Sequence, residues 1–358
     1  MTTGKTKVAV NGYGVIGKRV AEAVILQDDM ELAGVTDITA DWRMQVASGK
    51  GMRTYAARPE ASAAMTASGI EVAGNLDELL AAADVVVDCT PKKVAAANIE
   101  TYRKMAKKFI LQGGEKHDAT GHSFVAECSY ESALGRDATR VVSCNTTSIV
   151  RTLSALKRAG LLRKARGTLL RRATDPWESH LGGIMNTLVP EPEIPSHQGP
   201  DARTVDPELD VVTMAVKVPQ TLSHLHYWNI ELTREAAKEE VLDAFRESSR
   251  IVLVRIDRGL AALNAVKEWM LDIGRPHGDL YEVAIWEDML KVDGNELYYA
   301  YMVDNQAIVI PETIDAIRAL AGGESDGKAS MARTDAALGI KGLGGMMPSP
   351  RGTELGNP

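Results

Sequence analysis

The sequence predicts an α/β protein in which a doubly wound parallel sheet precedes an α+β domain with a mainly antiparallel sheet. Three observations carry this prediction. Apolar strand-like runs alternate with helical stretches through residues 1–143. A glycine-rich turn follows the first of these runs. From about Gly167 the runs lengthen and alternate between apolar and polar residues, as strands of an antiparallel sheet do.

The composition is that of a globular protein large enough for two domains. The chain has 358 residues, 45% hydrophobic and 25% charged, with a net charge of -7 that disfavours a general nucleic-acid binder. No apolar run approaches a membrane span, and the N-terminus lacks a signal-peptide core. The three cysteines, Cys89, Cys128 and Cys144, have neither disulfide nor metal-site spacing. We expect a cytoplasmic protein with free thiols, no metal and no nucleic-acid or membrane partner.

The first strand, Lys7–Asn11, leads directly into the glycine-rich turn. The stretch "NGYGVIG" places Gly12, Gly14 and Gly17 in a GxGxxG pattern that opens a helix. The first glycine allows the tight turn, the second lets a pyrophosphate approach the backbone, and the third lets helix and strand pack closely. The helix N-terminus adds N–H groups and partial positive charge. This βα context predicts a Rossmann-type dinucleotide domain, and the alternative is an ordinary glycine-rich loop.

Further strands predict which cofactor binds and where. "MELAGVTD" ends at Asp37, 20 residues beyond Gly17, where a carboxylate binds the adenosine ribose hydroxyls and repels a 2′-phosphate. NAD is therefore expected in preference to NADP, with a solvated acid as the alternative. "AADVVVDCTP" and "KKFILQGGEKHD" are later buried strands, the second with Gly113 and Gly114 at its carboxyl end, where ligands of parallel sheets bind.

The second half carries its own local signals. Asp293-Gly294 predicts a hairpin in "YEVAIWEDMLKVDGNELYYAYMV". "TREAAKEEVLDAFRES" predicts an amphipathic helix with Thr233 as its N-cap, and "PETIDAIRALAGG" predicts a late helix. The Gly- and Pro-rich residues 341–358 predict a disordered tail.

One cysteine lies where a strand meets a helix. In "VVSCNTTSIVRTL", apolar residues recur at helical spacing after Asn145, so Cys144 lies at a helix N-terminus. Unsatisfied N–H groups there favour a nucleophilic thiolate, whereas a buried inert thiol better describes Cys89 and Cys128. A nucleophilic thiol needs a partner base. His224 and His226 share one strand face and His197 lies in a turn-rich loop, and spacing does not choose among them.

Taken together, these segments resemble the archaeal-type (class II) glyceraldehyde-3-phosphate dehydrogenases along nearly the whole chain. "AVNGYGVIGKRVA", "LQGGEKHD", "RVVSCNTTSIVRTL", "LRRATDP", "IPSHQGPD", "VPQTLSHLHYWNIEL" and "IPETIDAIRAL" recur in the family's order. The resemblance implies a homotetramer. It implies a cofactor domain at 1–143, a catalytic domain at 144–303 and a segment at 304–340 that returns to the first domain.

The resemblance also implies roles for individual residues. Cys144 is implied as the nucleophile and His224 as the catalytic acid/base. The residues implied to contact the substrate are Ser143, Asn145, Thr146, His197 and Gln198. Beyond the glycine motif and Asp37, the residues implied to contact the cofactor are Val15, Ile16, Gly113, Arg172 and Asn305.

The implied reaction is a step of glycolysis and gluconeogenesis. Glyceraldehyde 3-phosphate, inorganic phosphate and NAD(P) give 1,3-bisphosphoglycerate through a thiohemiacetal and a thioester on Cys144. The chain departs from the family at Gln198, which replaces a second histidine, and at "VDNQAIVIPE", which replaces an "HQES" run around Asn305. Alternatives are a dehydrogenase of another phosphorylated aldehyde such as erythrose 4-phosphate, an aspartate-semialdehyde dehydrogenase, or a non-catalytic NAD-binding sensor.

Overall fold

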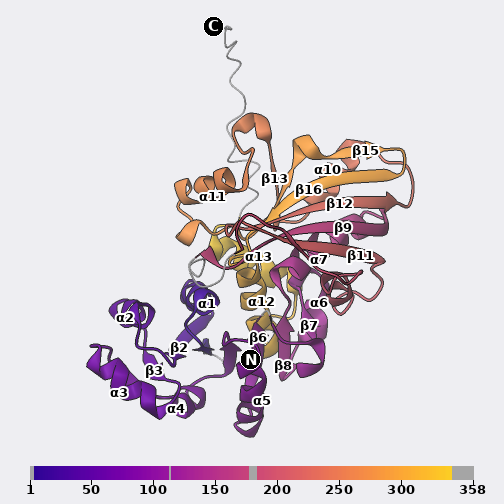
Figure 1. Ribbon diagram of the computed structural model, residues 1–358. Helices are drawn as coiled ribbons and strands as arrows, with labels where there is room; N and C mark the ends of the chain where they lie inside the picture. Colours follow the sequence, from indigo (N-terminus) through magenta and orange to yellow (C-terminus); the bar gives the residue numbers. More distant parts are fainter. Residues whose placement is uncertain (1–3, 113, 177–183, 341–358) are drawn as a thin grey trace.

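The computed structural model describes residues 4–112, 114–176 and 184–340, which form two sheets joined by helices (Figure 1). Gly113 and the predicted tail at 341–358 lie outside the described residues. The α/β class and the two-sheet plan predicted from the sequence are confirmed.

The first sheet is entirely parallel, with strand order β4-β3-β2-β1-β5-β6-β8-β7. Its order reverses between β1 and β5, the point at which open α/β sheets bind ligands. The strands are β1 (Thr6–Asn11), β2 (Met30–Asp37), β3 (Thr54–Ala56), β4 (Val72–Asn75), β5 (Val85–Asp88), β6 (Lys108–Gln112), β7 (Ser123–Phe124) and β8 (Ala138–Val141). The helices between them are α1 (Val15–Ile25), α2 (Trp42–Gly49), α3 (Pro59–Ala67), α4 (Leu76–Ala81), α5 (Val94–Lys104) and α6 (Ala126–Ala133).

The second sheet is mixed, with strand order β10-β11-β9-β12-β16-β14-β13 and β15 paired to β16. The β9–β11 and β13–β14 pairs are parallel and the others antiparallel. The alternating pattern of the sequence could not reveal the two parallel pairs. The strands are β9 (Leu162–Arg172), β10 (Val189–Pro190), β11 (Val211–Val218), β12 (His224–Leu232), β13 (Ile251–Val254), β14 (Val283–Trp286), β15 (Lys291–Asp293) and β16 (Glu296–Val303).

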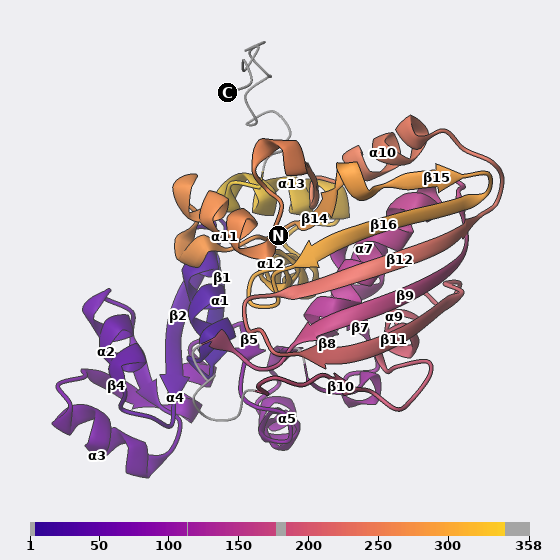
Figure 2. The same cartoon turned by 45° about the horizontal axis from the view of Figure 1, so that its top comes forward.

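Helices from the second half cover one face of this sheet and connect it to the first. Figure 2 shows α7 behind the second sheet, where it packs against β9, β14 and β16. Helix α12 packs against α1, α6 and β8 of the first half, and one continuous apolar core runs through both sheets. The helices are α7 (Cys144–Arg158), α9 (Gln198–Ala202), α10 (Lys238–Arg246), α11 (Leu263–Asp272), α12 (Val309–Ala321) and α13 (Gly327–Leu338).

The local signals of the second half have mixed outcomes. The predicted hairpin is confirmed, since β15 and β16 pair on either side of Gly294. The predicted N-cap at Thr233 is wrong, because α10 begins at Lys238 after Ala237. The Thr233 hydroxyl instead donates to the Gly160 carbonyl at 2.6 Å, which fastens the end of β12 to the turn after α7. Of the helices described, none has the length and apolar character to cross a bilayer.

Candidate active site

Cys144 is the first residue of α7, directly after the loop that follows β8. Ser143 caps the helix, and its hydroxyl accepts the Thr146 N–H at 3.3 Å. From the second sheet, His224 at the start of β12 brings its Nε2 to 3.5 Å from Cys144 Sγ. Residues 80 positions apart therefore meet as a thiol–imidazole pair between the two sheets.

The tautomer of His224 follows from its second nitrogen. Nδ1 accepts the backbone N–H of Arg172, the last residue of β9, at 3.0 Å. The neutral ring therefore carries its proton on Nε2, which faces the sulfur. Burial, with further contributions from His226, Arg172 and Arg171, lowers the pKa of His224 well below its ordinary value. The ring is neutral at physiological pH and presents an N–H donor to Cys144.

The pKa of the Cys144 thiol is raised, whereas the sequence predicts a lowered pKa. Burial raises the pKa of Cys144 to about 11, although Arg172, the Asn145 N–H and Arg171 each lower it. The expected low-pKa thiolate is wrong for the protein alone, because loss of hydration outweighs the helix N-terminus. Burial raises the pKa of Cys128 further, to about 12, which agrees with its interpretation as an inert core thiol.

The second strand histidine supports Asn145 and does not contact the thiol. His226 Nε2 lies 2.9 Å from Asn145 Oδ1, and its Nδ1 lies 3.0 Å from the Tyr301 hydroxyl. Burial, followed by Arg171, lowers the pKa of His226 to about 3. A neutral His226 therefore fixes the Asn145 amide beside Cys144.

Thr146 lies beneath the site. Its side chain is fully buried, and its hydroxyl donates to Asp201 Oδ2 at 2.7 Å while lying 2.9 Å from Ser143 Oγ. Asp201 also pairs with Arg140 on β8. The Thr146 hydroxyl therefore positions Ser143, and its predicted contact with the substrate stays a prediction.

Two predicted site residues, Gln198 and Arg172, carry buried polar atoms that bond to none of the described residues. The Gln198 amide is completely buried, and neither of its polar atoms bonds to any residue that the structure describes. Arg172 pairs with Asp175 at 2.9 Å through Nη2, whereas its Nε and Nη1 find no partner in the described part of the chain. The His197 side chain is 61% exposed and opens on a pocket of about 800 Å³ that Ser143 also lines. Buried polar atoms of this kind are satisfied when a polar ligand binds.

The glycine-rich turn forms a cradle for a dinucleotide. Gly12 has φ +94°, and a Cβ on Gly17 would lie 1.8 Å from the Gly12 carbonyl oxygen, so neither position accepts a side chain. A Cβ on Gly14 would meet nothing within 4 Å, which leaves the backbone open to a ligand. Val15 and Ile16 form the first turn of α1. The cradle fits the phosphates of a dinucleotide at the β1–β5 switch point.

Two further predicted cofactor residues are Asp37 and Asn305. Asp37 ends β2, and its Oδ2 accepts the Tyr13 N–H at 2.8 Å, while Oδ1 accepts bonds from Ile38 and Thr39. The carboxylate is thus held against the turn. Asn305 is 8% exposed, and its Oδ1 has no hydrogen-bond partner among residues 4–112, 114–176 and 184–340.

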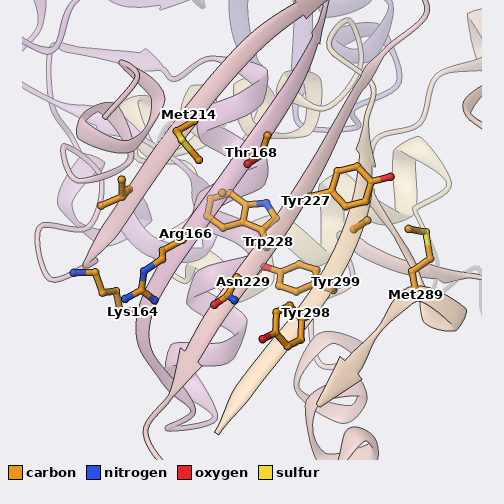
Figure 3. A pocket seen from close by; sticks show the side chains of 13 residues that line it. Lys164, Arg166, Thr168, Met214, Tyr227, Trp228, Asn229, Met289, Tyr298 and Tyr299 are labelled. Atoms are coloured by element: carbon orange, nitrogen blue, oxygen red, sulfur yellow. The ribbon is translucent and has the colours of Figure 1, made fainter. Parts of the chain in front are cut away.

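A separate hollow lies on the outward face of the second sheet. Figure 3 shows its lining from β9, β11, β12 and β16, with Met214, Tyr227 and Tyr298 around it. None of the predicted site residues lines it. Its apolar surface suits contact with protein rather than chemistry on a small anion.

Sequence analysis missed several residues near the site. Arg171 acts electrostatically on Cys144, His224 and His226, and Glu191 pairs with it. The signal for Arg171 was its place beside Arg172 in the tandem pair of "LRRATDP". Asp201 follows His197 by four residues, and no local pattern indicates that it lies under Thr146.

Comparisons with known proteins cover nearly the whole chain. Residues 143–266 match the glyceraldehyde 3-phosphate dehydrogenase C-terminal domain family, and residues 6–115 match the dihydrodipicolinate reductase N-terminus family. Proteins called glyceraldehyde-3-phosphate dehydrogenase are similar along their length. The relative from Methanobrevibacter smithii is 44% identical over 93% of this chain and 99% of its own, and that from Methanococcoides burtonii is 47% identical over 94% and 99%. The relative from Pyrobaculum calidifontis is 47% identical over 88% and 92%.

Proposed function

The chain belongs to the archaeal-type glyceraldehyde-3-phosphate dehydrogenase family, and we propose that it catalyses the phosphorylating oxidation of glyceraldehyde 3-phosphate. The observation that carries the proposal is the 3.5 Å contact between Cys144 Sγ and His224 Nε2, with two arginines beside it. The substrates are then the aldehyde, inorganic phosphate and a nicotinamide dinucleotide, and the product is 1,3-bisphosphoglycerate. We further propose that the enzyme acts in glycolysis and gluconeogenesis and that it is cytoplasmic.

The residues present fit a nicotinamide cofactor. Gly12, Gly14 and Gly17 would hold the pyrophosphate and Asp37 the adenosine ribose. The side-chain oxygen of Asn305, which bonds to none of the described residues, would hold the carboxamide end. Gly113, Val15, Ile16 and Arg172 are further proposed contacts. When bound, the nicotinamide ring supplies the hydride acceptor.

The chain's own groups account for the remaining chemistry. Cys144 first loses its proton to solvent, because His224 presents an N–H and not a lone pair to the sulfur. Sγ then adds to the aldehyde carbon, and the aldehyde oxygen takes the negative charge. The Nε2–H of His224 and the amide of Asn145 are placed to stabilise that oxygen. Loss of hydride from the same carbon leaves a thioester on Cys144. Inorganic phosphate attacks this thioester, and the acyl phosphate leaves as the thiolate is restored.

The proposed function is tested by following cofactor reduction at 340 nm with a panel of aldehydes, with and without inorganic phosphate. Turnover of glyceraldehyde 3-phosphate that requires phosphate would support the proposal. Turnover without phosphate would indicate a hydrolytic enzyme. A preference for erythrose 4-phosphate would move the assignment to that aldehyde, and cofactor binding without turnover of any aldehyde would favour the non-catalytic sensor.

The geometry of His224 predicts a donor role in place of the expected base role. Because Nδ1 accepts the Arg172 N–H, the ring offers Nε2–H and is a poor proton acceptor. His224→Gln retains an N–H near that position, so we expect a decrease in kcat of about tenfold. His224→Ala should lower kcat by about 10²- to 10³-fold, as loss of one oxyanion donor does. Steady-state kcat values of both variants distinguish the two roles. An equal loss of kcat in His224→Gln and His224→Ala would support the base role.

We propose NAD as the preferred cofactor because of the carboxylate at the end of β2. Asp37 is fixed by the Tyr13 and Thr39 N–H groups and repels a 2′-phosphate. Wild-type protein should have a higher kcat/KM with NAD than with NADP. Asp37→Ser should shift the ratio toward NADP by at least about tenfold, equivalent to about 1.4 kcal/mol. Equal use of both cofactors by the wild type would contradict this assignment.

We propose a homotetramer that uses the outward face of the second sheet. Its large apolar side chains are exposed on β11, β12 and β16: Met214 by 47%, Tyr227 by 43% and Tyr298 by 36% (Figure 3). Helix α7 already covers the opposite face, so a second copy of the sheet is the occupant that would bury this one. Light scattering should give about 154 kDa, four times the 38.6 kDa of one chain. Met214→Glu should lower that mass, and an unchanged mass would exclude this face.

A further inference from the structure

The carboxylate of Glu191 lies between the guanidinium of Arg171 and the imidazole of His197. Glu191 follows β10 and pairs through Oε1 with Nη1 of Arg171, at the end of β9. Its Oε2 lies 3.5 Å from Nδ1 of His197. One carboxylate therefore bridges an arginine and a histidine, as an oxyanion of a phosphate would.

Arg171 has the properties of an anion-binding residue of the site. Its charge acts electrostatically on the thiol of Cys144, on His226 and on His197. Its Nε is buried and bonds to none of the residues that the structure describes. The Gln198 amide, next to His197, is likewise buried and unpaired within the described ranges. Arg171, His197 and Gln198 together offer more hydrogen-bond donors than the single carboxylate of Glu191 can accept from.

We propose that Glu191 is an internal anion that occupies the phosphate position between Arg171 and His197, and that a phosphate ligand binds there by displacing it. The inference rests on the proposed function, because that function supplies phosphate-bearing substrates. A phosphate dianion carries more charge and more acceptor oxygens than a carboxylate, so it competes for the same donors. Glu191 thereby determines specificity, because an anion that binds Arg171 and His197 less tightly than phosphate does not displace it.

The position of Glu191 allows such a displacement. β10 is the edge strand of the second sheet, and its residues Val189 and Pro190 are exposed. The Glu191 N–H donates to the Ala215 carbonyl at 2.9 Å. Its side chain is 21% exposed, so the carboxylate can turn to solvent without unpacking the core.

Binding of inorganic phosphate tests the inference directly, by calorimetry on the full-length protein without an aldehyde. Glu191→Gln should tighten phosphate binding by about fivefold to tenfold, because a tethered competing anion lowers the apparent affinity. Arg171→Gln should weaken it by at least about tenfold. Glu193→Gln is the matched control, since Glu193 lines the same pocket as His197 and acts on it only through its charge, whereas Glu191 pairs directly with Arg171. It should change the affinity by less than about twofold.

The outcomes separate this inference from the proposed function. Unchanged or weaker phosphate binding in Glu191→Gln would overturn it, as would an equal gain in Glu193→Gln. If Glu191→Gln binds phosphate more tightly but the wild type does not oxidise glyceraldehyde 3-phosphate, the role of Glu191 as an internal anion is supported and the proposed reaction is refuted. In an active enzyme, Glu191→Gln should also lower KM for phosphate with little change in kcat.

Discussion

Replacing Cys144 with alanine should lower phosphate-dependent turnover of glyceraldehyde 3-phosphate by about 10⁴- to 10⁶-fold. The thiol is the atom that becomes bonded to substrate in both covalent intermediates, so its removal leaves only binding and electrostatic stabilisation. Cofactor binding should persist, because the glycine-rich turn at Gly12–Gly17 belongs to the other sheet. Initial rates at 340 nm together with calorimetric titration of the cofactor measure both effects.

Cys128→Ala provides the matched control for this variant. Its sulfur lies 3.0 Å from Ser154 Oγ within the core, and its pKa of about 12 keeps it protonated. The change should cost about 1 kcal/mol of stability and leave turnover within about threefold. Retained phosphate-dependent turnover in Cys144→Ala would refute the covalent mechanism.

The raised pKa of Cys144 also makes its alkylation depend on pH. A thiol with a pKa of about 11 is ionised in about one molecule in 10⁴ at pH 7. The rate at which iodoacetamide labels Cys144 in the protein alone should therefore rise about tenfold per pH unit between pH 7 and pH 9. A rate that levels off below pH 7 would mean that the helix N-terminus and the two arginines outweigh burial.

The sequence predicted those features that depend on neighbours along the chain. The glycine motif, the strand ending at Asp37 and the helix beginning at Cys144 each follow from a short window of residues. The choice between His224 and His226 does not, because it depends on how β12 pairs with β9. That register sets Leu225 opposite Leu170, which brings the Arg172 N–H to the His224 ring.

The pKa of Cys144 and the ion pairs between distant residues could not be predicted from the sequence, for a physical reason. The N-terminal position of Cys144 predicted a low pKa, but the sign of the shift depends on how far the folded chain excludes water from the sulfur. Glu191 is 20 residues from Arg171, and Asp201 is 61 from Arg140. Each pair forms only when separate strands and loops meet, so no spacing rule identifies it.

A buried ionic network next to α7, the helix that carries Cys144, could not be predicted from the sequence for the same reason. Glu312 on α12 is completely buried, and its Oε1 accepts bonds from Arg151 at 2.5 Å and from Arg250 at 3.1 Å. Its Oε2 accepts the Ala126 N–H at 2.6 Å. Arg151 lies on α7, two turns after Cys144, so the network joins the nucleophile helix to the C-terminal helices. Although burial raises the pKa of Glu312, Arg151 and Arg250 hold it below its ordinary value.

Glu312→Gln should lower the free energy of unfolding by about 3–5 kcal/mol, the second large effect that we expect. The amide keeps the shape of the side chain but removes the carboxylate that pairs with buried Arg151, whereas Arg250 keeps Asp315 and Asp335 as partners. Urea or thermal unfolding measures the loss. In the wild type, this part of the stability is present above about pH 4.5, where the unfolded carboxyl is ionised, and is lost as the pH falls through the lowered folded pKa.

Glu239→Gln is the control for a carboxylate paired with arginine in water. Its partner Arg246 is 44% exposed and Glu239 itself 68% exposed, so the change should cost less than about 1 kcal/mol. Similar losses in both variants would mean that the buried network contributes no more than a surface pair. A large loss confined to Glu312→Gln, with kcat reduced at temperatures where the variant remains folded, would show that the network also positions α7. Arg151 then acts as a positioning residue, through the helix that carries Cys144.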